Sequence, residues 1–555
     1  MEPIDEPHWR AGTRGDRIRL VSTQVAEHGF GTPGADRVRS LLRIGLYIVG
    51  GIGFALTTDG LGVWGGGSDI GTWWREPIVF QKVVLWSLMF DGLGLGCRAG
   101  PRLALPDLLY PLRPGTIRLP PLRLPCARGD TQTPVDAALY LLFLTATVFT
   151  LLSDGTGPDA GLASAVGVIP VWKVAVVVGL LTLLVLRDKV FFVAAGAGMY
   201  GVLTVTFLFP TIDMIVAAKL VMVIIWVGAA TAKLHRGFPF VMAIMMSSSP
   251  LVRRRRMKRR CYQHFPDDLR PGRLARTIAY TGTFVEFTAP LMLLLSPGVW
   301  GERPIVAATA LVLLHLAILS AMPVGSPLEW NVFMIFGIFT LFVDKAPIGL
   351  GDLEHPVPVA ILAGAVVGAV TLGNLIPRRS WFVAPNMRYF AGNANATLWC
   401  LAPSAQDKLH TAANLPHERQ IYLGYALRAL NTNGRALFTL VNRAIPQAHH
   451  GEYTIVDGEW ICGAAVGLRF ADGAMHSEQL VAALQRRCHF EPGEARIVVL
   501  DAQPLHRQAQ EYRLIDAATG EFERGRVRVA DLVSRQPWAD DVPVQVSGHH
   551  SHSGR

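Results

Sequence analysis

The composition of the chain excludes an ordinary soluble globular protein. Of its 555 residues, 51% are hydrophobic and 17% are charged, and the mean hydropathy is +0.33, whereas a soluble domain carries about 25% charged residues. The net charge of +10 and the isoelectric point of about 9.5 would also suit a nucleic-acid-binding protein. The basic residues, however, crowd beside the ends of apolar runs, which is the positive-inside signature of membrane proteins. We therefore expect no nucleic-acid partner.

The N-terminal segment, residues 1–40, is polar and rich in arginine. It lacks the short apolar core and the small-residue cleavage site of a secretory signal peptide. We expect this segment to stay in the cytoplasm and the first apolar run to act as an uncleaved insertion signal.

The middle of the chain, residues 41–379, predicts about ten transmembrane helices, because each long apolar run approaches the roughly 20 residues that cross a bilayer core. A helix also satisfies its own backbone hydrogen bonds in lipid. The fold class predicted for the whole chain is an all-α polytopic membrane protein with a small cytoplasmic α+β C-terminal domain. The predicted spans are 41–58, 78–97, 134–152, 165–186, 190–209, 212–232, 278–296, 305–322, 331–343 and 357–376.

Arginine-rich loops alternate with loops that are poor in positive charge, and this alternation predicts the orientation. The loop 59–76 contains Trp64, Trp73 and Trp74, and it is placed outside because tryptophan prefers the membrane interface. The arginines of 98–128 place that loop inside, and its proline-rich part, 111–125, is expected to be extended. Both termini are then predicted to be cytoplasmic.

The strongest inside signal follows the sixth predicted span. The apolar stretch 238–246 is too short to cross a bilayer and is expected to lie along the inner surface of the membrane. The basic run that follows has two compatible interpretations, a topology anchor and a site for anionic lipid head groups. Its residues are Arg253, Arg254, Arg255, Arg256, Lys258, Arg259 and Arg260.

Ionisable residues inside the predicted spans mark the candidate site, because such groups are costly in lipid and usually face a protein interior or a wet cavity. At about 1.5 Å of rise per residue, Lys219, Glu286 and His315 fall at similar depths, so the three side chains can meet. They would form a catalytic, proton-handling cluster. The alternative is a structural ion pair that fixes helix packing, with the histidine bonded to a neighbouring carbonyl. Asp91 is expected to snorkel or to lie at a helix end.

From residue 380 the charges rise and the apolar runs shorten, which predicts a cytoplasmic α+β domain over 380–546. Residues 475–488 have helical spacing, 495–502 predict a strand, and 511–532 predict two strands around a tight turn. A cytoplasmic protein partner would dock on this domain by default. The His- and Ser-rich segment 547–555 is expected to be a disordered tail.

No motif identifies a cofactor or a metal. The six cysteines are scattered without a C-x-x-C pair, so neither a disulfide framework nor a zinc site is predicted. The glycines of 91–96 lack the spacing and flanking elements of a nucleotide-binding loop. His476 and His506 have no partner motif and are expected to be ordinary surface histidines.

Several distinctive segments are spread over nearly the whole chain: EHGFGTP (27–33), WWREPIVFQKVVLW (73–86), LRPGTIRLP (112–120), FPDDLRPGRLAR (265–276), PLEWNVFMIF (327–336), MRYFAGN (387–393) and HRQAQEYRLIDAATGEFERG (506–525). They resemble a family of large actinobacterial transmembrane proteins that is catalogued only as a domain of unknown function. The resemblance implies a bacterial plasma-membrane location and transfers no catalytic residue.

Two shorter segments, LVMVIIWVGAATAKL (220–234) and LHLAILSAMPVG (314–325), are similar to the horizontally transferred transmembrane domain, the family that includes vitamin K-dependent γ-carboxylase. Members of that family with known activity use a membrane-embedded base and a quinol. This resemblance implies a quinone-class substrate.

Two classes of function are consistent with the sequence. The first is a membrane-embedded enzyme that acts on a lipid or isoprenoid-quinone substrate, with Lys219, Glu286 and His315 handling protons. The second is a non-enzymatic lipid-binding, transport or scaffold protein, in which the charged cluster fixes packing. Transport is the weaker version, because the chain shows none of the internal repeats of many secondary transporters.

Overall fold

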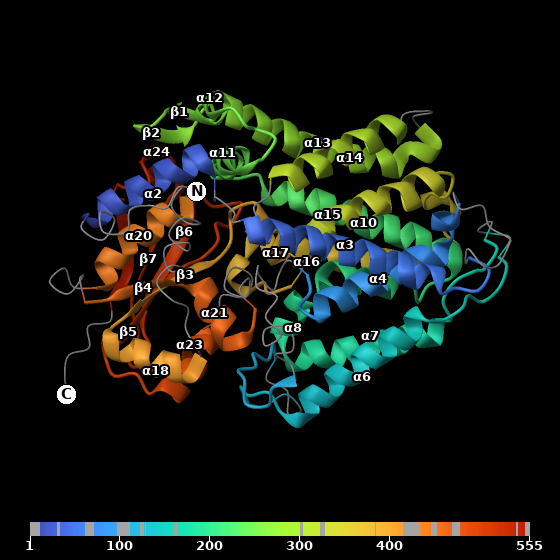
Figure 1. Ribbon diagram of the computed structural model, residues 1–555, viewed down its shortest axis with the longest axis horizontal. Helices are drawn as coiled ribbons and strands as arrows, with labels where there is room; N and C mark the ends of the chain where they lie inside the picture. Colours follow the sequence, from blue (N-terminus) through green and yellow to red (C-terminus); the bar gives the residue numbers. More distant parts are fainter. Residues whose placement is uncertain are drawn as a thin grey trace.

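A bundle of helices is followed, at one end of its long axis, by an antiparallel sheet that carries helices on both faces (Figure 1). The computed structural model describes residues 12–29, 34–61, 72–96, 112–122, 127, 129–159, 161, 164–299, 304–321, 328–382, 384–413, 432–445, 452–468, 478–539 and 542–549.

Within these described ranges, six helices are long and apolar enough to cross a membrane. Each overlaps a predicted span, and each owes its length to an apolar run without an internal break. They are α3 (Gly34–Leu56), α6 (Pro134–Leu151), α10 (Thr211–Ala232), α13 (Arg273–Val299), α14 (Pro304–Ala321) and α16 (Pro356–Leu375).

The other predicted spans are shorter or interrupted, so ten spans are not confirmed. Two are single helices, α4 (Pro77–Gly92) and α7 (Val171–Arg187). α7 starts later than predicted because Pro170 precedes its first turn. Two others contain a π-helical segment, and Gly196, at φ +60°, breaks the first of these. Their parts are α8 (Lys189–Ala194), η5 (Ala197–Gly201) and α9 (Val202–Thr206), and α15 (Leu328–Gly337) followed by η6 (Ile338–Asp344).

Helix α10 occupies the centre of the bundle. Protein buries 72% of its most apolar window, whereas the corresponding share in the other five long helices is at most 33%. A helix that is apolar on all sides is expected at such a position. Its neighbours are α13, α16, α9 and the short α17 (Ala384–Phe390).

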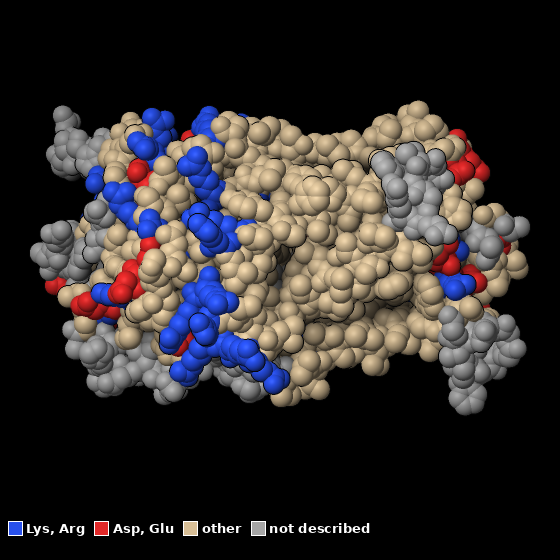
Figure 2. All heavy atoms as spheres, turned by 90° about the horizontal axis from the view of Figure 1, so that it is seen from above, with Lys and Arg blue, Asp and Glu red and all other residues tan. Residues whose placement is uncertain are grey.

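The outside of the bundle is apolar. Leu42, Phe284, Ile305, Val357 and Ile361 are each between 65% and 68% exposed, which suits contact with acyl chains rather than with water. On the face that Figure 2 shows, the middle of the bundle carries no Lys, Arg, Asp or Glu, and Lys and Arg gather at the end that adjoins the sheet. The surface therefore has the form expected of a transmembrane protein.

The C-terminal sheet has the strand order β4-β3-β5-β6-β7-β8, and every neighbouring pair is antiparallel. The strands are β3 (Ala396–Leu401), β4 (Thr454–Asp457), β5 (Ala495–Leu500), β6 (Ala509–Asp516), β7 (Gly520–Arg528) and β8 (Val544–His549). This sheet, with its flanking helices, is the α+β texture expected from the sequence.

Successive residues of β3 face two different cores. Leu398 and Cys400 pack in a cluster with helices α20 (Thr432–Ala444) and α24 (Val529–Ser534), whereas Trp399 and Leu401 pack with α18 (Pro403–Ala413), α21 (Gly458–Val466) and α23 (Glu478–Cys488). The first cluster also holds Ile18 of α2 (Arg14–His28). The second extends to residues of α8, so the sheet shares a core with the bundle.

The predicted elements of the C-terminal region are largely confirmed by α23, β5 and the β6–β7 hairpin. The last part of 511–532 was wrong, since residues 529–532 belong to α24. The ladder between β7 and β8 ends at Val527, which pairs with Val544, and Leu532 then turns onto the sheet and is fully buried. Residues 547–549 lie in β8, and His476 and residues 550–555 lie outside the described residues.

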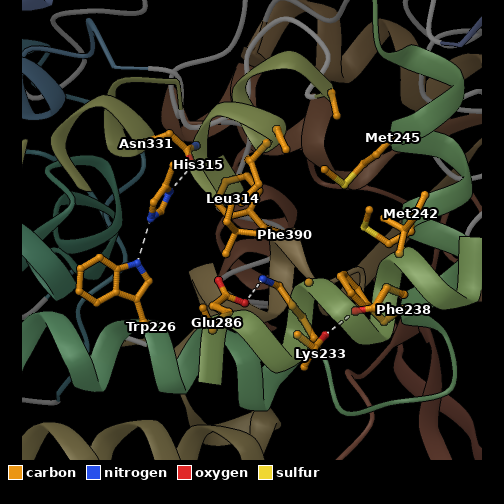
Figure 3. Close-up of a pocket in the computed structure, with 18 of the residues that line it drawn as sticks. Trp226, Lys233, Phe238, Met242, Met245, Glu286, Leu314, His315, Asn331 and Phe390 are labelled. Atoms are coloured by element: carbon orange, nitrogen blue, oxygen red, sulfur yellow. Dashed lines mark hydrogen bonds and ion pairs between the residues drawn. The ribbon is translucent and has the colours of Figure 1, made fainter. Parts of the chain in front are cut away.

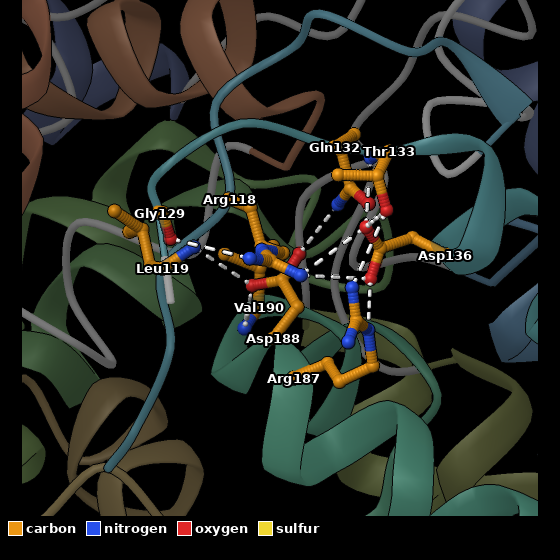
Figure 4. A network of polar contacts seen from close by, with 9 residues as sticks. All are labelled: Arg118, Leu119, Gly129, Gln132, Thr133, Asp136, Arg187, Asp188 and Val190. Atoms are coloured by element: carbon orange, nitrogen blue, oxygen red, sulfur yellow. Dashed lines mark hydrogen bonds and ion pairs between the residues drawn. The ribbon is translucent and has the colours of Figure 1, made fainter. Parts of the chain in front are cut away.

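A buried polar network joins the loop before α6 to the ends of α6 and α7 (Figure 4). Asp136, in the first turn of α6, accepts hydrogen bonds from Arg118 at 3.0 Å and from Arg187 at 2.5 Å. Asp188 accepts one from Gln132 at 2.9 Å and two from backbone N–H groups. Of the proline-rich stretch, residues 112–122 are described. Ile117 forms a bridge to Thr131 and residues 118–120 are non-helical, whereas Pro114 and Gly115 form a turn, so the predicted extended form is confirmed only for the part after this turn.

We predict that Asp136→Asn lowers the free energy of unfolding by about 3 kcal/mol or more, because it removes the carboxylate that pairs with the buried Arg118 and the half-buried Arg187. The control is Asp130→Asn, which removes the exposed ion pair with Arg486 and should cost less than about 1 kcal/mol. Denaturant unfolding of the purified protein, followed by intrinsic fluorescence, measures both. Equal losses in the two variants would contradict this account of the network.

Candidate functional site

A cavity of about 190 Å³ lies among α10, α13, α14 and α15, with α17 and the short helix α11 (Phe238–Ser248) beside it (Figure 3). This volume exceeds the roughly 150 Å³ that holds benzene in an engineered protein cavity. The lining is mostly apolar, and its methionines can adapt their shape to a ligand. They are Met242, Met245, Met246, Met334 and Met387.

An ion pair between Lys233 and Glu286 forms part of the cavity wall. Lys233 directly follows the last residue of α10, Glu286 lies in the middle of α13, and the Lys233 ammonium donates a hydrogen bond to Glu286 Oε2. The side chains of the lysine and the glutamate are 15% and 6% exposed. Lys233 Nζ also lies 5.7 Å from the centre of the Phe238 ring. The pair therefore links α10 to α13 away from water.

Two neighbours hold the imidazole of His315 in one tautomer. Trp226 Nε1 donates to His315 Nε2 at 2.9 Å, and an indole nitrogen can only donate, so Nε2 carries no proton. The other ring nitrogen, Nδ1, lies 2.8 Å from Asn331 Oδ1 and is then the donor. His315 is thus neutral, and both of its ring nitrogens are engaged by protein groups.

The ion pair keeps hydrogen-bonding capacity that a ligand can use. A carboxylate has two oxygens and an ammonium has three N–H groups, and the pair uses one of each. The described residues supply no further side-chain hydrogen bond to either group, and both residues line the cavity. A ligand hydroxyl, carbonyl or phosphate would find both a donor and an acceptor here.

The structure brings Glu286 and His315 to one cavity but places Lys219 elsewhere, so the predicted pairing of Lys219 with Glu286 was wrong. Lys219 Nζ donates to the backbone carbonyls of Lys345 at 2.7 Å and Ile348 at 2.5 Å. Lys219 lies near the start of α10 and Lys233 just after its end, about 21 Å apart at 1.5 Å per residue. One sequence feature could have identified Lys233 as the partner of Glu286: it stands near the end of the segment 220–234, which resembles the γ-carboxylase family.

The basic run lies on short helix α12 (Arg255–Arg259) and its flanks, and most of its side chains are exposed. Arg259 pairs with Glu27 of α2 at 2.5 Å and lies 4.9 Å from the centre of the Phe265 ring. Asp91 lies at the end of α4 but is only 3% exposed, so the snorkelling interpretation was wrong for it. His506 forms no ion pair among the described residues.

A family model described as a transmembrane protein of unknown function (DUF3556) matches residues 1–547, and the chain belongs to this family. The searches of curated proteins and of solved structures found no match. The family establishes a transmembrane protein and leaves its function open.

We predict that Lys233→Met and Glu286→Gln are energetically coupled. Each single change should lower the free energy of unfolding by about 3 kcal/mol or more, and the double change by less than the sum, because it leaves no unpaired buried charge. Lys219→Met is the matched control and should couple to Glu286→Gln by less than about 0.5 kcal/mol. Coupling with Lys219 instead of Lys233 would overturn the assigned pair.

We also predict that the His315 ring carries its proton on Nδ1 and none on Nε2. Nitrogen NMR of the histidine-labelled protein, with His315→Gln to assign the signal, measures this tautomer. Trp226→Phe removes the donor to Nε2 and should shift that resonance. A protonated Nε2 in the unaltered protein would contradict the described geometry.

Proposed function

We propose that this member of the DUF3556 family binds an amphipathic, lipid-class ligand in the cavity, with the polar group of the ligand at the Lys233–Glu286 pair. One observation carries the proposal: a mostly apolar cavity in a membrane bundle has a buried ion pair in its wall with unused donors and an unused acceptor. Sites for small molecules typically combine an apolar lining with a few convergent polar groups. The apolar part of the ligand would lie among the methionines.

A lipid and an isoprenoid quinone are the two ligand classes that fit this chemistry. The quinone has additional support, because both segments that resemble the γ-carboxylase family line the cavity. Residues 220–234 contribute Trp226 and Lys233, and residues 314–325 contribute His315. A quinone carbonyl would accept a hydrogen bond from the Lys233 ammonium.

A membrane-embedded enzyme is the second candidate, and the position of Glu286 favours it. Of the residues first assigned to proton handling, Glu286 has an oxygen that is available to a ligand, so it would act as the base, with Lys233 holding its charge. His315 would have a structural role in the cavity wall, because both of its ring nitrogens are hydrogen-bonded to protein groups. Lys219 would have no role in catalysis. A binding, transport or scaffold role needs no catalytic base. It therefore agrees equally well with a Lys233–Glu286 ion pair that serves only to hold the helices together.

We further infer a bacterial plasma-membrane location with both termini in the cytoplasm. The gathering of Lys and Arg at the sheet end of the bundle supports this orientation (Figure 2). The exposed basic run, Arg253 to Arg260, would then meet anionic lipid head groups. The C-terminal domain would face cytoplasmic protein partners.

We predict that Gly282→Leu displaces the ligand. A Cβ at Gly282 meets only Leu314 Cδ1, at 3.9 Å, so a side chain can start there without a clash, and Gly282 lines the cavity that the rest of the leucine would occupy. Gly364→Leu is the matched control, because a Cβ there meets nothing within 4 Å and Gly364 does not line the cavity. Mass spectrometry of the protein purified in native lipid discs should find one enriched lipid or quinone that Gly282→Leu loses and Gly364→Leu keeps. Retention of bulk lipid alone, equal in all variants, would refute the proposal.

A further inference from the structure

Arg388, in α17, is a buried arginine that lacks a counter-ion. It is 1% exposed, and in the described part of the chain its Nε, Nη1 and Nη2 atoms have no hydrogen-bond partner. No described carboxylate forms an ion pair with it. Burial lowers the pKa of Arg388 to about 9, so the guanidinium still carries its charge at neutral pH. Folded proteins pair such a charge or bind it to a ligand, because an isolated buried charge is very unfavourable.

Two more buried polar side chains in the neighbouring chain segments are also without partners. Both polar atoms of the Asn374 amide, in α16, and the Ser380 hydroxyl lack a hydrogen bond in the part of the chain that is described. Asn374 is 3% exposed and Ser380 is 5% exposed. Orphaned buried groups are rare in native proteins and each needs an explanation.

The packing brings α16 and α17 together at one place. A Cβ on Gly228 of α10 would lie 2.9 Å from Met387 Sδ and 3.0 Å from Val370 Cγ1, so Gly228 touches both helices. Asn374 follows Val370 by one helical turn on the same face of α16, and Arg388 follows Met387 directly. Figure 1 shows α17 at the junction of the bundle and the sheet.

The loop 503–505 ties the same two helices to the C-terminal sheet. The backbone N–H of Leu505 donates to the Asn374 carbonyl at 3.1 Å. Gln503 N–H donates to Asn393 Oδ1 at 2.7 Å, and Asn393 N–H donates to the Arg388 carbonyl at 2.9 Å. The backbones of Asn374 and Arg388 are therefore tied to the same loop, and Ser380 lies in the chain segment that connects α16 to α17.

We propose that this junction binds a phosphate group through Arg388, with Asn374 and Ser380 as further hydrogen-bond donors. This site goes beyond the proposed function and is separate from the Lys233–Glu286 cavity. A guanidinium binds two phosphate oxygens at once, and an amide and a hydroxyl can serve the remaining oxygens. The phosphate belongs either to a phospholipid head group or to a soluble phosphorylated molecule.

Binding of inorganic phosphate to the full-length, delipidated protein in detergent tests the site, together with native mass spectrometry of the protein before lipid removal. We expect saturable binding that Arg388→Met weakens about 10- to 100-fold, because charge-assisted hydrogen bonds are lost. Arg379→Met removes a nearby exposed arginine and should leave binding unchanged. If Arg388→Met does not fold, Ser380→Ala serves instead and should weaken binding several-fold.

The same experiment separates the two sources of phosphate. A phospholipid that is retained before lipid removal and lost in Arg388→Met assigns the site to a head group. Phosphate binding without a retained phospholipid assigns it to a soluble molecule. Gly282→Leu should change neither result, so the proposed phosphate site and the proposed cavity ligand are tested independently of each other. The absence of saturable phosphate binding to the unaltered protein, or binding that Arg388→Met leaves unchanged, would overturn the proposal.

Discussion

The architecture depends on one constraint: every charged group on the central helix α10 must find its partner within the protein. At its first turn, Asp213 accepts hydrogen bonds from the backbone N–H groups of Glu354 and His355. Further along, Lys219 is held by backbone carbonyls, and just beyond the last turn Lys233 is held by a carboxylate. Since unpaired charges are excluded from a low-dielectric interior, these contacts fix the rotation of α10 and the helices around it.

The irregular backbone of the bundle follows from the same constraint. The carbonyls that bind Lys219 come from residues 345–348, directly after the π-helical η6. These carbonyls lie at and beyond the end of the helix, where backbone C=O groups have no helical N–H partner and can accept another donor. Irregular backbone inside a membrane is tolerated where protein surrounds it, and Leu341 and Phe342 of η6 are buried. The turn that follows the ninth apolar run thus supplies backbone acceptors for the Lys219 ammonium, which would be unstable in lipid.

The sequence predicts the regular parts of this molecule well and its side-chain partners poorly. The run 212–232 predicts α10 because it is apolar over the length of a membrane span, and its one glycine, Gly228, does not interrupt the helix. The break at Gly196, in contrast, depends on a backbone angle that hydropathy does not register. The membrane depth estimated from the sequence correctly predicted that Glu286 and His315 meet at one cavity. Depth alone does not determine which lysine reaches the Glu286 carboxylate. That choice depends on how the chain folds back after η6. Arg388 lies outside every apolar run, so hydropathy did not mark it, although it stands in the distinctive segment MRYFAGN (387–393).

The position of α2 has a consequence for how the protein is made. Ile18 packs in one core with Leu532 and Val542, and the Arg19 guanidinium lies 5.3 Å from the centre of the Trp538 ring. Ribosomes add about 5–20 residues per second, so after its synthesis α2 waits roughly half a minute or longer for these contacts. During that time the bundle is already entering the membrane. Completion of the fold is therefore a late event that joins two segments far apart in the sequence, around residues 18 and 540.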